Sequence, residues 1–471
     1  MLTYGFGAIG ESVKNVGFNI FLLFYYNQVL HVSATGTSIV LAIALVFDAV
    51  TDPIAGSLSD KLQSRWGRRH PFILFSALPL AFSFYMLFNP PVLSDSGYLG
   101  WLLVFAILVR GSMTFYHVPH LALGAEMATD YRQRSTLYGF ATFFGFMGAS
   151  MFVPLSYLLF FPTTEQFNPG LLNQAAYSPW GIFSGGIIVF AILTCVLGTF
   201  SEVPHMRKRE VVSQENFSVT RLIREVRDVF ANRSFRAIFF GMMLTTIILS
   251  VEGVFNQFMG FHFYGMTTEQ LSLVPIGQIT GLVLALFLTP LLTRRFDKKP
   301  TLIGCALIII GSVNLPIVML LLDVSWFPAR GSTPLLLILM VTIGCTTMLA
   351  PVVFASLNSM FADIADEHEL DIGERREGII FSARSFAVKA TASLGLVFGG
   401  MLLDFIRFPR GASLGSVPDE IVWQLGFIAG PATSIFTTIG VLMYMGYRID
   451  NQRHQEIMAG LKARRPVAGD E

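Results

Sequence analysis

The chain has 471 residues, of which 53% are hydrophobic and only 13% are charged, well below the charged fraction of an average soluble domain. So few polar residues cannot cover the surface of a soluble globule of this length, and a formal net charge of +1 excludes nucleic-acid binding by bulk charge. Apolar runs of about 20 residues recur along the whole chain, and each is long enough to cross a bilayer. Because a backbone in lipid must satisfy its own hydrogen bonds, these runs predict a polytopic, all-α membrane protein.

Twelve transmembrane helices are predicted in two groups of six. Their ranges are 3–29, 36–58, 71–89, 98–122, 136–160, 180–202, 237–263, 270–292, 300–322, 334–362, 378–404 and 423–447. The long polar segment between the sixth and seventh spans divides the chain. This predicts an N-terminal six-helix bundle at 1–202, a linker at 203–236, a C-terminal six-helix bundle at 237–447 and a tail at 448–471.

The positive charges orient these spans. Of the 32 lysines and arginines, 25 lie in the even-numbered loops, the linker and the tail, whereas the odd-numbered loops hold three. Positive loops stay in the cytoplasm, so both termini are predicted to be cytoplasmic. Within the linker, Val219, Leu222, Ile223 and Val226 repeat at helical spacing between arginines. This pattern favours an amphipathic helix on the anionic membrane surface, or a solvated linker helix.

The sequence offers no machinery for covalent chemistry. Cys195, Cys305 and Cys345 all lie inside apolar runs, where they are typical of small buried side chains and not of a structural metal site. A nucleophile elbow, a P-loop and a His/Cys metal cluster are not recognisable in the sequence. The chain is therefore predicted not to be an enzyme and to need no cofactor.

The most specific chemical signal lies in the second span. Asp48, Thr51 and Asp52 occupy positions i, i+3 and i+4, so they share one helix face. An ionisable group at membrane depth is costly and marks a functional site by default. Two carboxylates and a hydroxyl supply hard oxygen ligands for a small cation, and close carboxylates could equally carry a proton.

Other polar residues inside the spans predict a water-filled cavity that binds a solute. Glu11 and Asn15 lie one turn apart on the first span, although Glu11 could instead neutralise Lys14. Lys389, deep in the eleventh span, needs a carboxylate, and we expect Asp48 or Asp52 to provide it. For each such charge the alternative is a salt bridge that pairs helices, and for a histidine it is simple packing. The candidate solute-binding residues are Glu11, Ser12, Asn15, His117, Glu252, Asn256 and Lys389.

Several motifs resemble one family closely. Residues 47–53 read Phe-Asp-Ala-Val-Thr-Asp-Pro, and Gly56, Ser59-Asp60-Lys61 and residues 64–71 (Ser-Arg-Trp-Gly-Arg-Arg-His-Pro) follow. This pattern resembles the span-two signature of the glycoside–pentoside–hexuronide:cation symporters, the melibiose-carrier-like branch of the major facilitator superfamily. Residues 122–126 and 377–389 also match. The likeness extends from the first span to the eleventh.

The resemblance implies a two-bundle fold that binds its solute between the halves and works by alternating access. It implies symport of a solute with Na⁺, H⁺ or Li⁺. By position, the cation-binding residues are Asp48, Asp52, Thr51 and Thr114, and Lys389 matches the lysine of the eleventh span. The resemblance also implies a cytoplasmic gate in which charge pairs lock one bundle to the other, formed by Asp60, Arg65, Arg68, Arg69 and Arg134.

The solute half of the site departs from the family. Melibiose-type members bind sugar hydroxyls through acidic residues on spans one and four, a tryptophan on span four and an arginine on span five. The corresponding positions here are Ser12, His117, Leu121 and residues 141–142.

The expected function is uptake of a small organic solute, a sugar or glycoside, with Na⁺ or H⁺. The alternatives are an amphiphile such as a lysolipid, or a non-transporting sensor on a transporter fold.

The expected partners are this solute, a monovalent cation and membrane lipids, with no nucleic acid. The protein is expected to work as a monomer in the inner membrane of a bacterium.

Overall fold

The computed structural model describes residues 1–62, 64–127, 131–204, 230, 232–372 and 377–464. Every regular element within these ranges is helical. The helices of the first half are α1 (Leu2–Phe6), α2 (Ala8–Val16), α3 (Ala34–Lys61), α4 (His70–Leu87), α5 (Asp95–Met127), α6 (Tyr131–Phe160) and α7 (Tyr177–Thr199). Those of the second half are α10 (Arg233–Phe258), α11 (Thr268–Leu271), α12 (Val274–Arg295), α13 (Lys298–Leu321), α14 (Thr333–Ile372), α15 (Glu377–Phe405), α16 (Asp419–Phe427), α17 (Thr433–Met443) and α18 (Asn451–Arg464).

The predicted membrane spans are present as helices. In the described ranges, 11 helical stretches are long and apolar enough to cross a membrane. The first predicted span consists of α1 and α2 followed by π-helical turns at Gly17–Leu22 and Tyr25–Val29, and the residues that join these pieces keep right-handed helical dihedrals. It is therefore a helical segment interrupted by wide turns. The all-helical, multi-pass fold predicted from the sequence is confirmed.

Several helices extend beyond their predicted ranges. The helix α14 continues to Ile372, ten residues past the predicted span, and α5 continues to Met127. Hydropathy reports only the part of a helix that lies in hydrocarbon, so polar turns that continue a helix into the cytoplasm escape it. Most of the linker, residues 205–229 and 231, lies outside the described residues, so its amphipathic helix stays a prediction.

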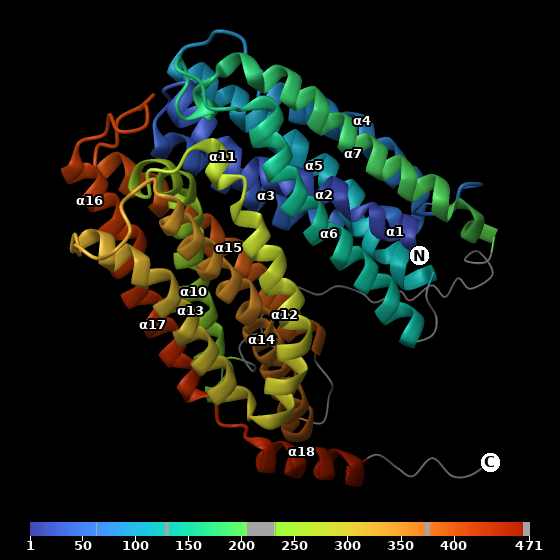
Figure 1. The fold of residues 1–471 in the computed structure, drawn as a ribbon. Helices are drawn as coiled ribbons and strands as arrows, with labels where there is room; N and C mark the ends of the chain where they lie inside the picture. Colours follow the sequence, from blue (N-terminus) through green and yellow to red (C-terminus); the bar gives the residue numbers. More distant parts are fainter. Residues whose placement is uncertain (63, 128–130, 205–229, 231, 373–376, 465–471) are drawn as a thin grey trace.

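The two halves of the chain form two groups of helices that meet at one end. In Figure 1 the helices of the first half (blue to green) and of the second half (yellow-green to red) converge near α11 and α16. The groups diverge toward the end that carries the N-terminus and α18. Since the charge distribution makes both termini cytoplasmic, the halves are joined on the periplasmic side and spread toward the cytoplasm.

Hydrogen bonds between helix ends, and from one helix end to the loop after α15, hold the joined end. The carboxylate of Asp404, near the end of α15, accepts hydrogen bonds from the backbone N–H groups of Ala34 (3.3 Å) and Thr35 (2.8 Å). These N–H groups belong to the first turn of α3, where the helix dipole favours a negative charge. The Gln28 side chain donates to the Pro409 carbonyl at 3.2 Å and accepts from the Ala412 N–H at 3.1 Å. We call these contacts the periplasmic latch.

Glycines allow a close contact between two helices of the second half. Gly277 and Gly281 on α12 face the backbone of α14, and a Cβ atom at Gly281 would overlap the Gly344 carbonyl and the Thr347 hydroxyl. A Cβ atom at Gly277 would overlap the Met340 carbonyl. Two small residues four apart let helix backbones approach in a membrane, where van der Waals packing drives association. The close approach of α12 and α14 therefore depends on the absence of side chains at Gly277 and Gly281.

Candidate functional site

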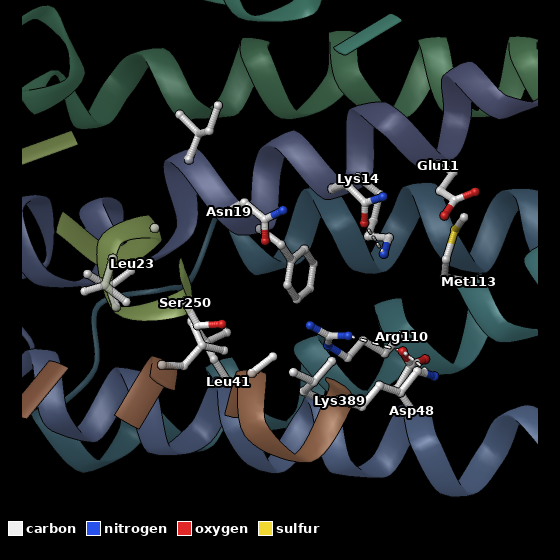
Figure 2. Close-up of a pocket in the computed structure, with 18 of the residues that line it drawn as sticks. Glu11, Lys14, Asn19, Leu23, Leu41, Asp48, Arg110, Met113, Ser250 and Lys389 are labelled. Atoms are coloured by element: carbon white, nitrogen blue, oxygen red, sulfur yellow. Dashed lines mark hydrogen bonds and ion pairs between the residues drawn. The ribbon is translucent and has the colours of Figure 1, made fainter. Parts of the chain in front are cut away.

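A central cavity of about 820 Å³ lies between the two halves of the chain. Residues of α2, α3 and α5 line it from the first half, and residues of α10 and α15 line it from the second. Figure 2 shows Glu11, Lys14 and Asn19 on the first membrane span above the cavity, with Asp48, Arg110 and Lys389 gathered below. Of the charged groups predicted to face water, Glu11, Asp48, Asp52 and Lys389 therefore share one cavity at the interface of the halves.

Three oxygen-bearing side chains converge on one side of this cavity. The Thr114 hydroxyl on α5 lies 2.9 Å from Asp48 Oδ1 and 3.0 Å from Asp52 Oδ1, both on α3. Thr51 is at the edge of this group: its Oγ1 lies 3.1 Å from the Phe47 carbonyl and 3.5 Å from Thr114 Oγ1. The two carboxylates, one turn apart on α3, thus both lie within hydrogen-bond distance of one hydroxyl.

Two basic side chains neutralise these carboxylates. Arg110 Nη1 on α5 lies 3.3 Å from Asp48 Oδ2. Lys389 on α15 forms an ion pair with Asp52, and its Nζ is 3.7 Å from Asp48 Oδ2. The expected contact between Lys389 and the carboxylates of the second span is therefore present. Because Lys389 belongs to the second half, this contact joins the halves in the middle of the membrane.

The polar face of the first span lies opposite this cluster. The Glu11 carboxylate is 2.9 Å from His117 Nδ1, which links α2 to α5. Asn15 accepts a hydrogen bond of 2.7 Å from Lys14 Nζ. Ser12 donates to the Gly145 carbonyl of α6 at 2.8 Å and lines a smaller cavity of about 470 Å³, which Glu11, Asn15 and His117 border as well. Four predicted solute residues of the first half, together with Lys389 of the second, thus surround two adjoining cavities.

Glu252 and Asn256 do not line the central cavity. Glu252 is half-buried beside Thr433 of α17, and Asn256 is exposed. The same helix presents Ser250 and Gln257 to the cavity instead. Of these, Gln257 donates to the Tyr157 hydroxyl at 2.8 Å and so connects α10 to α6.

Sequence reasoning did not select Lys14, Arg110 or Gln257 as site residues, although all three line the cavity. For Lys14 and Arg110 the signal was available, because both are charges inside predicted spans. Gln257 carries no charge. Its place on the cavity side of α10 follows only from the rotation of that helix.

The charge pairs expected to lock one bundle to the other lie, among the described residues, within the first half of the chain instead. The side chains of Arg68 and Arg69 bind the Glu126 carboxylate, with Nε–Oε1 distances of 3.0 and 2.9 Å. Arg69 also contacts Ser59 and Asp60. These bonds tie the cytoplasmic ends of α3, α4 and α5 together. Arg65 is exposed, with its guanidinium 5.9 Å from the Trp66 ring, and the side chain of Arg134 lies outside the described residues.

The sequence matches a known family over nearly its whole length. The family model for MFS/sugar transport proteins covers residues 3–451. The chain belongs to this family. Its fold class, its multi-pass membrane location and its nature as a transporter rather than an enzyme follow from this membership together with the helical structure.

Curated relatives of the chain include proteins named as symporters. The inner membrane symporter YicJ of Escherichia coli is 24% identical over 86% of this chain and 81% of its own. The glucuronide carrier protein homolog of the same organism is 25% identical, covering 98% and 95%. The sodium-dependent lysophosphatidylcholine symporter 1 of Mus musculus is 24% identical, covering 99% and 88%. The relatives named as symporters support cation-coupled symport, and the names in this set mention compounds as different as a glucuronide and lysophosphatidylcholine.

A solved structure with the same fold is that of a bacterial homolog of the human lysosomal transporter Spinster, in an inward-facing and unoccupied conformation. It superposes with a TM-score of 0.60 at 15% identity, covering 99% of this chain and 97% of its own. This likeness shows that the two chains share a fold.

Proposed function

We propose that the chain is a secondary active symporter that couples uptake of a small organic solute, a sugar or glycoside, to a Na⁺ or H⁺ gradient by alternating access. The observation that carries this proposal is the convergence of Asp48, Asp52 and Thr114 oxygens at a cavity between the two halves. Carboxylate and hydroxyl oxygens are the ligands that hard cations prefer. The symporter relatives support the same assignment.

In this proposal the cation competes with Lys389. The Lys389 ammonium is the counter-ion of Asp52, and it is anchored on the other half of the chain. A cation that binds the two carboxylates and the Thr114 hydroxyl displaces this ammonium and releases one contact between the halves. Because the contact depends on conformation, cation binding shifts the balance between conformations. Coupling is reciprocal, so the solute must tighten cation binding by the same factor.

The solute is proposed to bind between the first span and α5. Glu11, Asn15 and His117 line the central cavity there, and Lys389 borders it from α15. These side chains offer both donors and acceptors to hydroxyl groups. The glucuronide carrier homolog among the relatives supports a sugar-like solute.

An amphiphile is the second candidate, because part of the cavity wall is apolar. Leu23, Phe24, Leu249 and Phe258 line the cavity beyond the charged groups. A polar region and an apolar region in one cavity suit a molecule with a headgroup and an acyl chain. The lysophosphatidylcholine symporters among the relatives support this candidate.

The test is a thermal-shift panel on the purified protein, in NaCl and in KCl at matched pH. Glycosides, uronides and lysophosphatidylcholine would be added one at a time, because a ligand of the folded state raises the melting temperature by mass action. We expect one solute class to stabilise the protein, and more strongly in Na⁺ or at one pH. A protein whose melting temperature ignores ions, pH and every solute would overturn the proposal. Binding without uptake into proteoliposomes would favour a sensor.

A further inference from the structure

One charge in the central cavity has no carboxylate partner. Lys14 lies on α2 and is 92% buried, and the hydrogen-bond partner of its ammonium is the neutral side-chain oxygen of Asn15, at 2.7 Å. The ammonium also lies 5.8 Å from the centre of the Phe18 ring. Neither contact supplies a negative charge. A buried ammonium at membrane depth without one is costly, and such residues mark binding sites.

The carboxylates of the cavity make their hydrogen bonds and ion pairs with other side chains. Glu11, one turn before Lys14, contacts His117 at 2.9 Å, while Asp48 and Asp52 pair with Arg110 and Lys389. Among the described residues, Lys14, Arg110 and Lys389 are the lysines and arginines that line the cavity. Of these three, Lys14 has no carboxylate within ion-pair distance. Figure 2 shows its side chain on the opposite side of the cavity from Asp48 and Lys389. Its ammonium is available to a group that enters the cavity.

The formal charges of the cavity lining indicate which charge a ligand of Lys14 should carry. The cavity lining contains three lysines and arginines (Lys14, Arg110, Lys389) and three carboxylates (Glu11, Asp48, Asp52). With His117 neutral, its formal charge is zero. A monovalent cation bound to the carboxylate pair therefore leaves one excess positive charge at membrane depth, where uncompensated charge is disfavoured. An anionic group on the solute would restore neutrality.

We propose that Lys14, with Asn15 beside it, forms a subsite for an anionic group, a carboxylate or phosphate, on the transported solute. This inference rests on the proposed symport function and narrows its substrate class. Cation and anionic solute then bind in a mutually favourable way, because each compensates the charge of the other across the cavity. Lys14 acts as a point charge for the anion, and Asn15 holds the ammonium at the cavity wall.

The test compares solutes that differ only in charge. The purified protein would be assayed by thermal shift in NaCl with methyl β-D-glucuronide against methyl β-D-glucoside, and with glucose 6-phosphate against glucose. We expect one anion of these pairs to raise the melting temperature more than its neutral partner. Which pair responds shows whether the subsite binds a carboxylate or a phosphate. Lys14→Met should abolish the preference, Lys14→Arg should retain it, and Arg233→Gln, an equal charge change at an exposed site, should not alter it.

A second measurement distinguishes a binding role of Lys14 from a structural role. If Lys14 is an unpaired charge kept for binding, Lys14→Met should raise the melting temperature of the protein without added solute by a few degrees. A lower melting temperature would show that Lys14 supports the fold, and equal responses to anionic and neutral solutes would remove the subsite. The response of the wild-type protein to Na⁺ alone reports on the carboxylate pair. If that response persists while the anion preference is absent, the subsite fails and the symport proposal stands.

Discussion

Lys389 of α15 forms an ion pair with Asp52 of α3, and this contact joins the two halves of the chain in the middle of the membrane. The same Asp52 accepts a hydrogen bond of 3.0 Å from Thr114, which also bonds to Asp48. One carboxylate thus belongs both to the proposed cation site and to the interface between the halves. A change at Asp52 should therefore affect ion binding and conformation together.

Asp52→Asn should abolish the dependence of solute binding on the cation. The amide has the shape of the carboxylate but lacks the charge that binds Na⁺ and attracts Lys389. We expect solute affinity in NaCl to fall by about 5- to 150-fold, the usual span of a coupling free energy. Thermal shift and proteoliposome uptake in NaCl and KCl would measure it. Asp52→Glu keeps the charge and should retain ion dependence, and an Asp52→Asn protein that still responds to Na⁺ would disprove the assignment.

Lys389→Gln should have the opposite effect and strengthen binding of the cation. Without the competing ammonium, Asp52 is free to bind Na⁺, so the half-saturating Na⁺ concentration should fall by about tenfold, equivalent to about 1.4 kcal/mol. A Na⁺ titration of the melting temperature would show it. Lys298→Gln is the control, because Lys298 pairs with Asp363 at 2.6 Å, away from the cavity. An unchanged Na⁺ titration would show that Lys389 is not the counter-ion that the cation displaces.

The sequence was sufficient for the helices and for the carboxylate cluster, and the reasons are physical. Apolar length and loop charge decide where a span lies and how it is oriented, so the multi-pass fold followed from hydropathy and from the positions of lysines and arginines. Asp48 and Asp52 share a helix face by their spacing alone. The partner of Lys389 was predictable because a buried ammonium requires a carboxylate and few were available.

Helix rotation could not be predicted for α10. Glu252 and Asn256 share one face of α10, but that face does not line the cavity, and Glu252 lies against Thr433 of α17. Sequence spacing shows which residues share a face, whereas packing against α15 and α17 decides where the face points. The lack of a carboxylate partner for Lys14 could not be predicted for a related reason. Glu11 lies one turn away in sequence, yet its carboxylate contacts His117.

Asp404→Asn should weaken the periplasmic latch. Asp404 accepts two hydrogen bonds at the N-terminus of α3, where a negative charge is worth about 0.3–1 kcal/mol. Its loss should increase the population that is open to the periplasm, by up to about fivefold. Leu23→Cys in a background without Cys195, Cys305 and Cys345 would report this through labelling by an impermeant maleimide, since Leu23 lines the cavity and is 8% exposed. Equal labelling rates with and without the Asp404 change would show that the latch does not control opening.

Arg69→Gln should destabilise the cytoplasmic ends of α3, α4 and α5. The Arg69 side chain is 7% exposed and binds Glu126, Asp60 and Ser59, so its removal takes one of two arginine donors from Glu126 and the arginine donor from the buried Ser59 hydroxyl. The expected loss is about 1.5–3 kcal/mol per charged hydrogen bond, visible as a lower melting temperature. Arg65→Gln in the same loop is the matched control, because Arg65 is exposed and should change stability by no more than about 0.5 kcal/mol. Equal effects of the two variants would contradict this account.

Gly281→Ala should disrupt the packing of α12 against α14. The added Cβ atom would overlap the Gly344 carbonyl, which is backbone and cannot turn away, as well as the Thr347 hydroxyl. Forcing a methyl group into a packed interface costs about 1–3 kcal/mol, and here the two helix backbones themselves must separate. Gly304→Ala on α13 makes the same chemical change where a Cβ atom meets nothing within 4 Å. It should leave the melting temperature unchanged or raise it slightly, because alanine favours helix over glycine by about 1 kcal/mol. A thermal melt of both variants in the same detergent decides the point, since equal melting temperatures would mean that α12 and α14 are not in backbone contact.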